Sequence, residues 1–300
     1  MTTTTAKTAV VRPVIAVIDS ERTLEGGGFP VRRPFPTAQL MQVDPFLLLD
    51  HLGPVTWGPG EGIGAPDHPH RGFETVTYLL SGEMQHKDSA GHSGALRPGD
   101  VQWMTAGAGV VHSELPSDAF MKHGGTLHGF QVWVNLPARD KMIPPRYQDI
   151  PAARIPESTS ADGKVKVRVI AGESLGQSAV IETRTPILYL HFTIRPGGEI
   201  VQPVPAHFNT LAYVIRGELR AGDEGRVLRE GQVARFGGSG DAARLAVNDA
   251  AAEPAEVLLL AGQPLNEPVE RYGPFVMNTR QEIVQAIRDF NEGRLGKIDF

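Results

Sequence analysis

The sequence predicts an all-β protein of two similar domains with a short C-terminal helix, and three observations carry this prediction. From Thr75 onwards, apolar runs alternate with Gly- or Pro-containing turns at intervals of about 8 to 12 residues, a spacing typical of a sandwich or barrel. Two segments of the first half recur, in the same order, in the second half. The final segment, in contrast, has apolar residues at helical spacing.

Composition limits the classes of function. The chain has 300 residues, 41% hydrophobic and 21% charged, which fits one large or two medium globular domains. A net charge of -5 and a pI near 6.1 argue against direct nucleic-acid binding, which needs a basic face. The absence of cysteine excludes disulfides, thiolate zinc sites and cysteine nucleophiles, so any metal must have nitrogen and oxygen ligands.

Targeting and membrane signals are missing from the sequence. The start, Met1 to Lys7, lacks a basic region followed by a long apolar region, and no apolar run approaches the roughly 18 residues of a membrane span. We therefore expect a soluble cytoplasmic protein with no membrane partner, although a cysteine-free chain is also compatible with other compartments.

The first part of the chain predicts strands and loops. Val10–Ile18 is rich in β-branched residues and the stretch from Arg32 to Leu49 ends in a continuous apolar run, so both favour strands. Gly26–Gly28 and Gly53–Pro66 are dense in Gly and Pro and predict loops. From residue 75, strands and turns alternate up to Thr126–Leu136. Changes in composition predict an amino-terminal barrel over residues 1–137, a connection over 138–164, a second barrel over 165–265 and a C-terminal segment over 266–300.

The C-terminal segment predicts one helix. The stretch from Thr279 to Glu282 is a capping-box signature and Gly293 follows as a stop signal. Between them, Ile283, Ile287 and Phe290 recur at helical spacing. We expect this helix to pack its apolar face on one of the barrels and to have no catalytic role.

An internal repeat indicates a duplicated domain. Thr75–Glu83 is similar to Thr210–Glu218, and Leu96–Val101 is similar to Leu228–Val233. Chance matching of Gly and Leu is the alternative explanation, but the conserved order over two separate turns favours duplication.

Two pairs of potential metal ligands stand at the ends of the stretch 67–114. His68 and His70 form one pair, and His112 and Glu114 form the other. Residues i and i+2 of a strand point the same way, with Cα atoms roughly 6.5 to 7 Å apart. Two such pairs on facing strands would aim three imidazoles and one carboxylate at a single ion.

The repeat provides an internal control for the metal interpretation. If these four residues were needed only for folding, the second domain should have them too. The corresponding residues are Pro203, Pro205, Arg244 and Ala246. The asymmetry favours metal chemistry in the first domain and a structural role for the second.

Ligand type leaves the metal undecided among Fe(II), Mn(II), Ni(II), Cu(II) and Zn(II). Facing pairs on a barrel wall would leave coordination positions open for water and substrate, as metal catalysis requires. Glu74 follows His70 by four residues and lies on the same face if the strand is regular. It would then be a ligand, a residue that orients a ligand, or an ion-pair partner of Arg71.

Several segments resemble one protein family. The spacing of Gly62, His68, His70, Glu74 and Gly82 resembles the first cupin motif, and Gly109-x-x-His112 resembles the second. Longer stretches resemble the pirin family: Asp67–Val76, Pro98–Gly107, His112–Glu114, Gln131–Leu136, Arg184–Pro186 and Gly273–Thr279.

The resemblance implies a bicupin with two face-to-face cupin barrels, a metal in the amino-terminal barrel only, and a C-terminal helix. It places the ligands at His68, His70, His112 and Glu114, with Glu74 outside the ligand set. Pirins typically bind iron, several show quercetin 2,3-dioxygenase activity, and animal members act as nuclear co-regulators of transcription.

Two hypotheses about function follow. As an enzyme, the protein would bind the 3-hydroxyl oxygen of a flavonol at mononuclear non-haem Fe(II), and dioxygen would cleave the heterocycle with loss of carbon monoxide. Glu114 is the expected base for the hydroxyl proton. Asp50, Arg71 and Gln131 are expected pocket residues, with a structural salt bridge as the alternative for Arg71. As a binding module, the protein would use the redox state of its metal to regulate a protein partner in transcription or metabolism, with any dioxygenase activity incidental.

Overall fold

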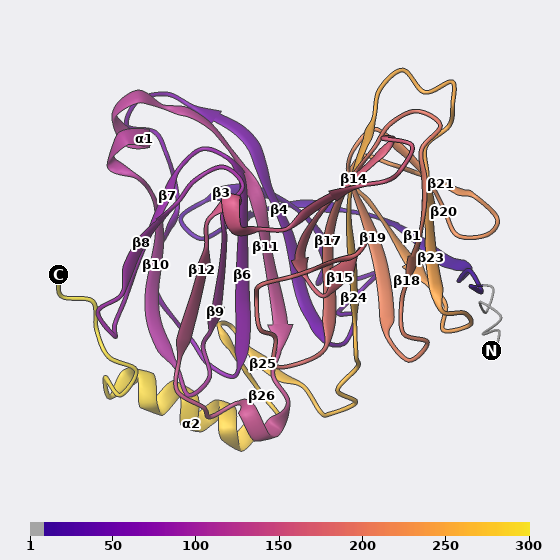
Figure 1. Cartoon of the computed structure of the whole chain (residues 1–300). Helices are drawn as coiled ribbons and strands as arrows, with labels where there is room; N and C mark the ends of the chain where they lie inside the picture. The colour runs from indigo at the N-terminus through magenta and orange to yellow at the C-terminus, as the bar shows by residue number, and fades with distance from the viewer. Residues whose placement is uncertain (1–8) are drawn as a thin grey trace. The chain divides into compact units, whose positions relative to one another are not determined.

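The computed structural model describes residues 9–300 and separates them into two compact units (Figure 1). The amino-terminal unit comprises Ser20–Ile155, Ile181–Thr185 and Leu265–Phe300. The carboxy-terminal unit comprises the described residues up to Asp19 together with Pro156–Val180 and Pro186–Pro264. Both units are built from antiparallel strands, which confirms the all-β prediction. Within residues 9–300, no helix is long and apolar enough to span a membrane.

The amino-terminal unit contains a seven-stranded sheet and a four-stranded sheet. Their strand orders are β12-β9-β6-β11-β4-β3-β2 and β5-β10-β7-β8. The strands are β2 Glu21–Glu25, β3 Phe29–Phe35, β4 Phe46–Trp57, β5 Ala65–His70, β6 Phe73–Ser81, β7 Met84–Asp88, β8 Ser93–Leu96, β9 Val101–Thr105, β10 Val110–Pro116, β11 Gly125–Asn135 and β12 Arg146–Ile150. The helical turns are α1 Asp118–His123, η1 Ala138–Asp140 and η2 Ala152–Arg154.

The carboxy-terminal unit has a seven-stranded sheet of order β1-β22-β19-β24-β17-β14-β13, a four-stranded sheet of order β18-β23-β20-β21, and the small hairpin β15-β16. The strands are β1 Val14–Asp19, β13 Glu157–Thr159, β14 Val165–Ala171, β15 Glu173–Ser174, β16 Gln177–Ser178, β17 Ile187–Ile194, β18 Glu199–Pro203, β19 Asn209–Arg216, β20 Glu218–Ala221, β21 Arg226–Arg229, β22 Gln232–Phe236, β23 Ala242–Ala246 and β24 Ala255–Gly262. Its interior is filled by packed aliphatic and aromatic side chains, among them Leu190, Phe192 and Leu259.

Strand order confirms the duplication inferred from the repeat. The four-stranded order β5-β10-β7-β8 of one unit matches β18-β23-β20-β21 of the other, and β9-β6-β11-β4 matches β22-β19-β24-β17. The repeated segments Thr75–Glu83 and Thr210–Glu218 therefore occupy the same place in both units, on β6 with the following turn and on β19 with the following turn.

The units are interleaved along the chain, which differs from the contiguous domains expected over 1–137 and 165–265. Strand β1 pairs with β22 of the carboxy-terminal unit, although it precedes the whole amino-terminal unit in sequence. The expected connection over 138–164 contains β12, which pairs with β9 and extends the amino-terminal sheet. Residues 138–164 are rich in Pro, and this composition does not indicate that part of the region is a strand that pairs with β9.

The loop expected over Gly53–Pro66 is shorter than its composition suggests. Strand β4 continues through Gly53 to Trp57, and β5 begins at Ala65. The pairing of β4 with β11 shifts register between Leu127 and Gly129, so a bulge accommodates Gly53. Gly53 has φ +72°, and a Cβ there would lie 2.4 Å from the carbonyl oxygen of Leu127, so glycine is required within the strand.

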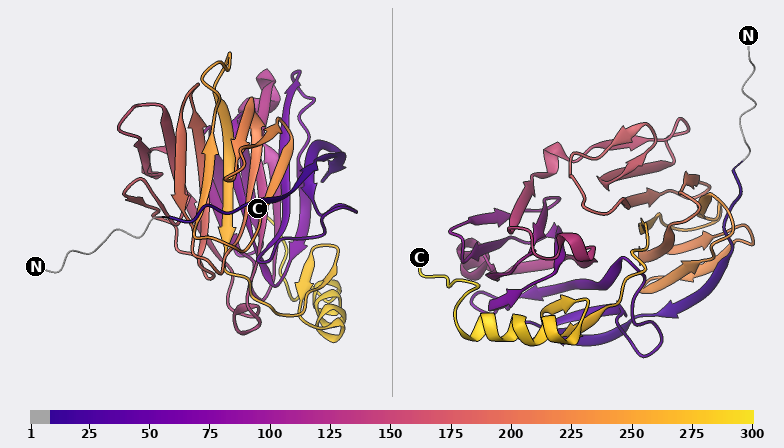
Figure 2. Two further views of the ribbon diagram at one scale, coloured as in Figure 1. Left: turned by 90° about the vertical axis from the view of Figure 1, so that its right-hand side faces the viewer. Right: turned by 90° about the horizontal axis from the view of Figure 1, so that it is seen from below.

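The C-terminal segment packs on the amino-terminal unit. Strands β25 (Glu270–Tyr272) and β26 (Phe275–Met277) form a hairpin, and helix α2 (Arg280–Asn291) follows it (Figure 2). The capping box of Thr279 and Glu282 is present, which confirms the predicted helix start. An apolar cluster joins the helix to the hairpin and to β10; it consists of Val111, Phe275, Met277, Ile283, Ala286 and Leu295.

Candidate metal centre

The three predicted histidine ligands converge in the four-stranded sheet of the amino-terminal unit. Strands β5 and β10 are antiparallel neighbours, with His112 opposite His68 and Val110 opposite His70. One potential ligand nitrogen from each of the three imidazoles lies within 4.8 Å of the others. The Nε2 atoms of His68 and His70 are 3.0 Å apart. Strand alternation thus places three imidazoles around one point, as the spacing predicted.

Backbone carbonyls orient two of these rings. Nδ1 of His68 lies 2.7 Å from the carbonyl oxygen of Pro66, and Nδ1 of His70 lies 3.4 Å from that of Pro274. A hydrogen on Nδ1 that is donated to a carbonyl leaves Nε2 with a free lone pair, which is the tautomer that binds metals. The second contact joins β5 to the turn between β25 and β26.

Burial keeps His70 and His112 neutral. Desolvation and the neighbouring imidazoles lower the pKa of both residues well below the usual value for histidine. Both ring nitrogens of His112 are buried without a hydrogen-bond partner. A buried polar atom without a partner is unfavourable, and a cation among the three rings would satisfy one of these nitrogens. The donor set therefore fits one divalent metal ion.

Glu114 lies beside the three histidines but outside their cluster. The pairing of β10 with β5 shifts register between His112 and Glu114, but the extra residue lies on β5 and the pairing of β10 with β7 is regular, so Glu114 faces the same side of the sheet as His112. Its Oε1 accepts a hydrogen bond of 2.7 Å from Thr77, and its Oε2 accepts one of 3.0 Å from Gln131. Thr77 and Gln131 thus hold the carboxylate of the fourth predicted ligand, which is not part of the imidazole cluster.

A cavity of about 550 Å³ adjoins the histidine cluster. His68, His70 and Glu114 lie on its wall, and the expected pocket residues Asp50 and Gln131 line it too. Its apolar wall is formed by Phe29, Leu48, Leu52, Met84, Leu127 and Trp133. The remaining wall comes from the C-terminal hairpin through Arg271, Gly273 and Pro274.

On one side of the cavity, acidic and basic side chains form ion pairs with one another. Arg33 donates to both carboxylate oxygens of Asp50, at 2.7 and 2.6 Å, and also pairs with Glu25. Burial outweighs these contacts and raises the pKa of Asp50 to about 6. The guanidinium of Arg271 lies 4.6 Å from the ring centroid of Trp133, in cation–π geometry.

Two predicted site residues have other roles. Arg71 does not line the cavity: its Nη1 donates to Asp289 of α2 at 2.7 Å, and its Nε donates to the carbonyl of Ala108 at 2.6 Å. This is the structural salt bridge that was the alternative for Arg71.

Glu74 cannot orient a ligand. The turn at Gly72, with φ +88°, separates β5 from β6, so Glu74 is not on the same strand as His70. Along β6, Thr77 faces the cavity and Glu74, three positions earlier, faces the opposite side of the sheet. There its Oε1 accepts a hydrogen bond of 2.6 Å from Thr105. The expectation assumed an unbroken strand, which the glycine turn prevents.

Sequence reasoning did not find Thr77, Trp133, Arg271 and Pro274 as site residues. Thr77 and Trp133 had a local signal, because each lies in a predicted strand at a position that alternation places on the inner face. Arg271 and Pro274 had none, since a contact between positions about 200 residues apart leaves no periodic pattern.

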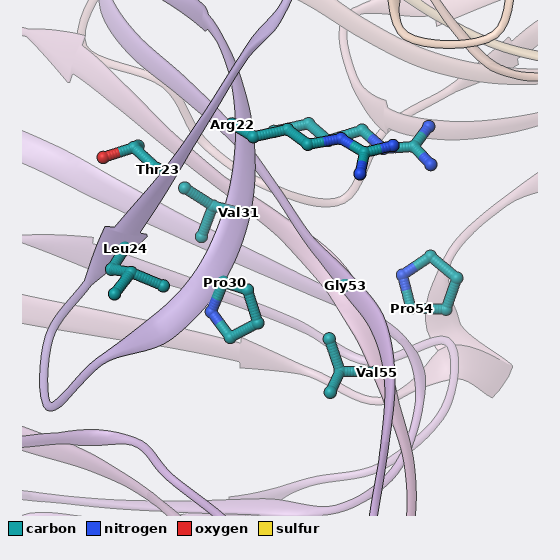
Figure 3. Close-up of a pocket in the computed structure, with 9 residues that line it drawn as sticks. Arg22, Thr23, Leu24, Pro30, Val31, Gly53, Pro54 and Val55 are labelled. Carbon is teal, nitrogen blue, oxygen red and sulfur yellow. The ribbon is translucent and has the colours of Figure 1, made fainter.

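A second hollow of the amino-terminal unit has different chemistry. It has a volume of about 350 Å³ and lies between the β2–β3 hairpin and β4, with Arg22, Leu24, Pro30, Pro54 and Val55 around it (Figure 3). Its lining includes no histidine and no carboxylate. It therefore supplies no metal ligands.

The buried histidines predict acid sensitivity of the metal-free protein. In the unfolded chain their pKa is about 6.5, and in the folded protein the pKa of His70 and of His112 is lower. Below pH 6.5 the unfolded state then binds more protons, so the free energy of unfolding falls as the pH drops. We expect a loss of about 1 kcal/mol per histidine between pH 6.5 and 5.5. Urea midpoints of metal-free protein at both pH values measure this loss, and equal midpoints would contradict the prediction. The control is His207→Asn: because His207 is exposed, this variant should show the same difference between the two pH values as wild type.

Comparison with known proteins supports one family over nearly the whole chain. Residues 28–134 match the family model described as Pirin, and residues 189–296 match the Pirin C-terminal cupin domain. A pirin-like protein of Solanum lycopersicum is 45% identical over 287 residues, covering 96% of this chain and 92% of the relative. Pirin of Homo sapiens is 43% identical, covering 94% and 93%.

A solved structure gives the same result. Quercetin 2,3-dioxygenase from Acinetobacter baumannii superimposes with a TM-score of 0.88 and 39% sequence identity, covering 97% of this chain and all of that chain. The two family models match one segment each of the amino-terminal and the carboxy-terminal half, in agreement with the duplicated strand order. The chain therefore belongs to the pirin family of bicupin proteins.

Proposed function

We propose that this protein is a metal-dependent dioxygenase of the quercetin 2,3-dioxygenase type, with a flavonol and dioxygen as substrates. The observation that carries the proposal is a cluster of three imidazoles that borders a largely apolar cavity. The similarity to the Acinetobacter baumannii quercetin 2,3-dioxygenase supports the reaction class. We propose Fe(II) as the ion, with Mn, Ni, Cu and Zn as the alternatives that elemental analysis would distinguish.

The size and lining of the cavity suit a planar aromatic substrate. A volume of about 550 Å³ lies within the range of about 300 to 1,000 Å³ typical of small-molecule sites. The indole of Trp133 and the ring of Phe29 offer flat apolar surface, whereas Asp50 and Gln131 offer polar atoms to ring hydroxyl groups. The centroid of the Trp133 ring is 5.3 Å from that of His70, so a ring that contacts Trp133 would also lie near the metal ligands.

The residues of the chain account for the proton in the proposed reaction. A divalent ion held by the three imidazoles would supply a Lewis acid for the 3-hydroxyl oxygen of the flavonol and a redox centre for dioxygen. Glu114 would accept the 3-hydroxyl proton on one carboxylate oxygen, while Thr77 or Gln131 holds the other. In the overall reaction, both atoms of dioxygen enter the ester product, C3 of the heterocycle leaves as carbon monoxide, and dioxygen is the oxidant.

Aerobic turnover of quercetin tests this proposal. Protein loaded with Fe(II) should remove the flavonol absorption band and release one carbon monoxide per flavonol consumed. Glu114→Gln removes the base and should lower kcat about 100-fold or more. The matched control is Glu224→Gln, at an exposed position of the carboxy-terminal unit, which should leave kcat unchanged. Metal-replete wild-type protein that leaves quercetin intact would overturn the proposal.

A further inference from the structure

A belt of polar side chains crosses the interior of the amino-terminal unit next to the histidine cluster. Gln131 of β11 is opposite Thr77 of β6, and Thr77 is opposite Gln102 of β9. On the other sheet, Glu114 of β10 is opposite His86 of β7. Directly opposed residues of an antiparallel pair point to the same face, so His86 and Glu114 share one face of the four-stranded sheet. His86 and Gln102 are the members of this belt that the proposed reaction does not use.

Hydrogen bonds fix the tautomer of His86. The Nε2 amide group of Gln102 donates to Nδ1 of His86 at 2.6 Å and to Oδ1 of Asp149 at 2.9 Å. These two contacts use both hydrogens of the amide, so Nδ1 of His86 is an acceptor. Burial lowers the pKa of His86, which favours the neutral ring, and a neutral ring with an acceptor at Nδ1 has its hydrogen on Nε2.

Packing holds the imidazole in this orientation. The ring of His86 stacks on that of Tyr147, with centroids 5.4 Å apart and planes inclined by 11°. On another side is Gly94, where an added Cβ would lie 2.5 Å from Cε1 of His86. The glycine therefore leaves the space that the ring occupies, and the Nε2–H group has a fixed direction.

The Nε2–H group of His86 is a buried donor without a partner. The residue is 2% exposed, and Nε2 has no hydrogen bond within the described chain. Leaving such a group unpaired is unfavourable, and an apolar residue at this position would avoid this penalty. The carboxylate of Glu114, opposite His86 across the ladder, is close enough for its charge to act on the imidazole.

We propose that His86 is a positioning residue of the metal centre, whose Nε2–H donates to the Glu114 carboxylate once that carboxylate turns to the ion. Glu114 lies outside the imidazole cluster, and Thr77 and Gln131 each donate to one of its oxygens, so a turn of the carboxylate to the ion moves it away from at least one of these donors. A fixed donor on the adjacent strand then replaces the contact that is lost and holds the oxygen that does not face the ion. The inference rests on the proposed metal centre and is independent of the substrate.

Metal affinity and the spectrum of the bound ion test the proposal without any substrate. His86→Leu removes the donor, and His86→Gln retains an N–H near the position of Nε2. Loss of a residue that orients a ligand typically weakens metal binding 10- to 100-fold. We expect a loss in this range for His86→Leu and recovery to within about 3-fold for His86→Gln, measured by competition with a chelator for Mn(II). The electron paramagnetic resonance spectrum of bound Mn(II) should change in the leucine variant and return towards wild type in the glutamine variant.

The outcomes separate this inference from the proposed function. Equal Mn(II) affinity and equal spectra for wild type and His86→Leu would overturn the role of His86 while leaving the metal centre intact. Failure of wild-type protein to bind Mn(II) or Fe(II) would overturn both proposals. Gln102→Leu provides a second variant in case His86→Leu does not fold: it leaves the imidazole in place but removes its anchor, and should weaken binding in the same direction. Unchanged Mn(II) affinity in Gln102→Leu would contradict the argument that Gln102 holds the Nε2–H donor of His86 in place.

Discussion

Replacement of His112 by alanine is expected to abolish stoichiometric metal binding. His112 faces His68 across the β5–β10 ladder and has two buried ring nitrogens with no hydrogen-bond partner among residues 9–300, so its replacement removes no hydrogen bond of this part of the chain. Its removal leaves the two imidazoles of β5, and the carboxylate of Glu114, the further predicted ligand, is held by Thr77 and Gln131. Elemental analysis of purified protein should give about one metal per chain for wild type and close to none for the variant.

The duplicated fold provides the control for this experiment. His207 belongs to the carboxy-terminal unit and is exposed, so His207→Ala should keep the wild-type metal content. Similar urea midpoints for metal-free wild type and His112→Ala would show that the loss of metal is not a loss of fold. A His112→Ala protein that retains one metal per chain would refute the three-imidazole centre and, with it, the proposed dioxygenase.

Replacement of Lys141 by methionine is expected to destabilise the amino-terminal unit by about 3 kcal/mol or more. Lys141 is 1% exposed, and its Nζ donates to the carbonyl of Gly72 at 2.7 Å, to Oδ1 of Asn135 at 2.7 Å and to the carbonyl of Val276 at 3.1 Å. Burial lowers the pKa of Lys141 to about 8, so at pH 7 the ammonium group keeps all three of its donors. Methionine has a similar length but leaves three buried acceptors unpaired, at about 1 to 3 kcal/mol each.

Urea unfolding of metal-free protein at pH 7 measures this loss. The control is Lys297→Met, because Lys297 is exposed and its replacement should change the midpoint little. The lost contacts connect the turn after β5 to β26. A protease should therefore cleave the C-terminal hairpin more readily in the variant than in wild type. Identical midpoints for Lys141→Met and wild type would show that the three contacts make no net contribution to the free energy of unfolding.

The convergence of the three histidines was predictable because it follows from a local rule. Residues separated by one position share a face of a strand, and the turns between the two ligand pairs make antiparallel pairing of their strands plausible from sequence alone. Applied to Glu74, the same rule predicted the wrong face of the sheet. The turn at Gly72 separates β5 from β6, so the alternation of side chains along β5 does not continue into β6. One residue with a positive φ was sufficient to reverse the face on which the carboxylate lies.

The rest of the site depended on contacts that no local pattern records. Asp289 is 218 residues from Arg71, and its partnership explains why Arg71 turns away from the cavity. The contact of Pro274 with His70 likewise joins distant parts of the chain. Burial also changed the expected chemistry: the sequence gives Glu114 as a potential ligand, but only the fold shows that Thr77 and Gln131 compete with the ion for its oxygens.

Interleaving of the two units has a consequence for protein synthesis. A ribosome releases β5 and β10 long before the last residues, yet Pro274, whose carbonyl accepts from His70, follows the whole carboxy-terminal unit in the chain. While translation is still under way, the nascent chain has its imidazoles but lacks one wall of the cavity and the helix that anchors Arg71. Secure retention of a metal ion is therefore expected only after the C-terminal hairpin and helix have been synthesised, so that metal loading would be a late step in the maturation of this protein.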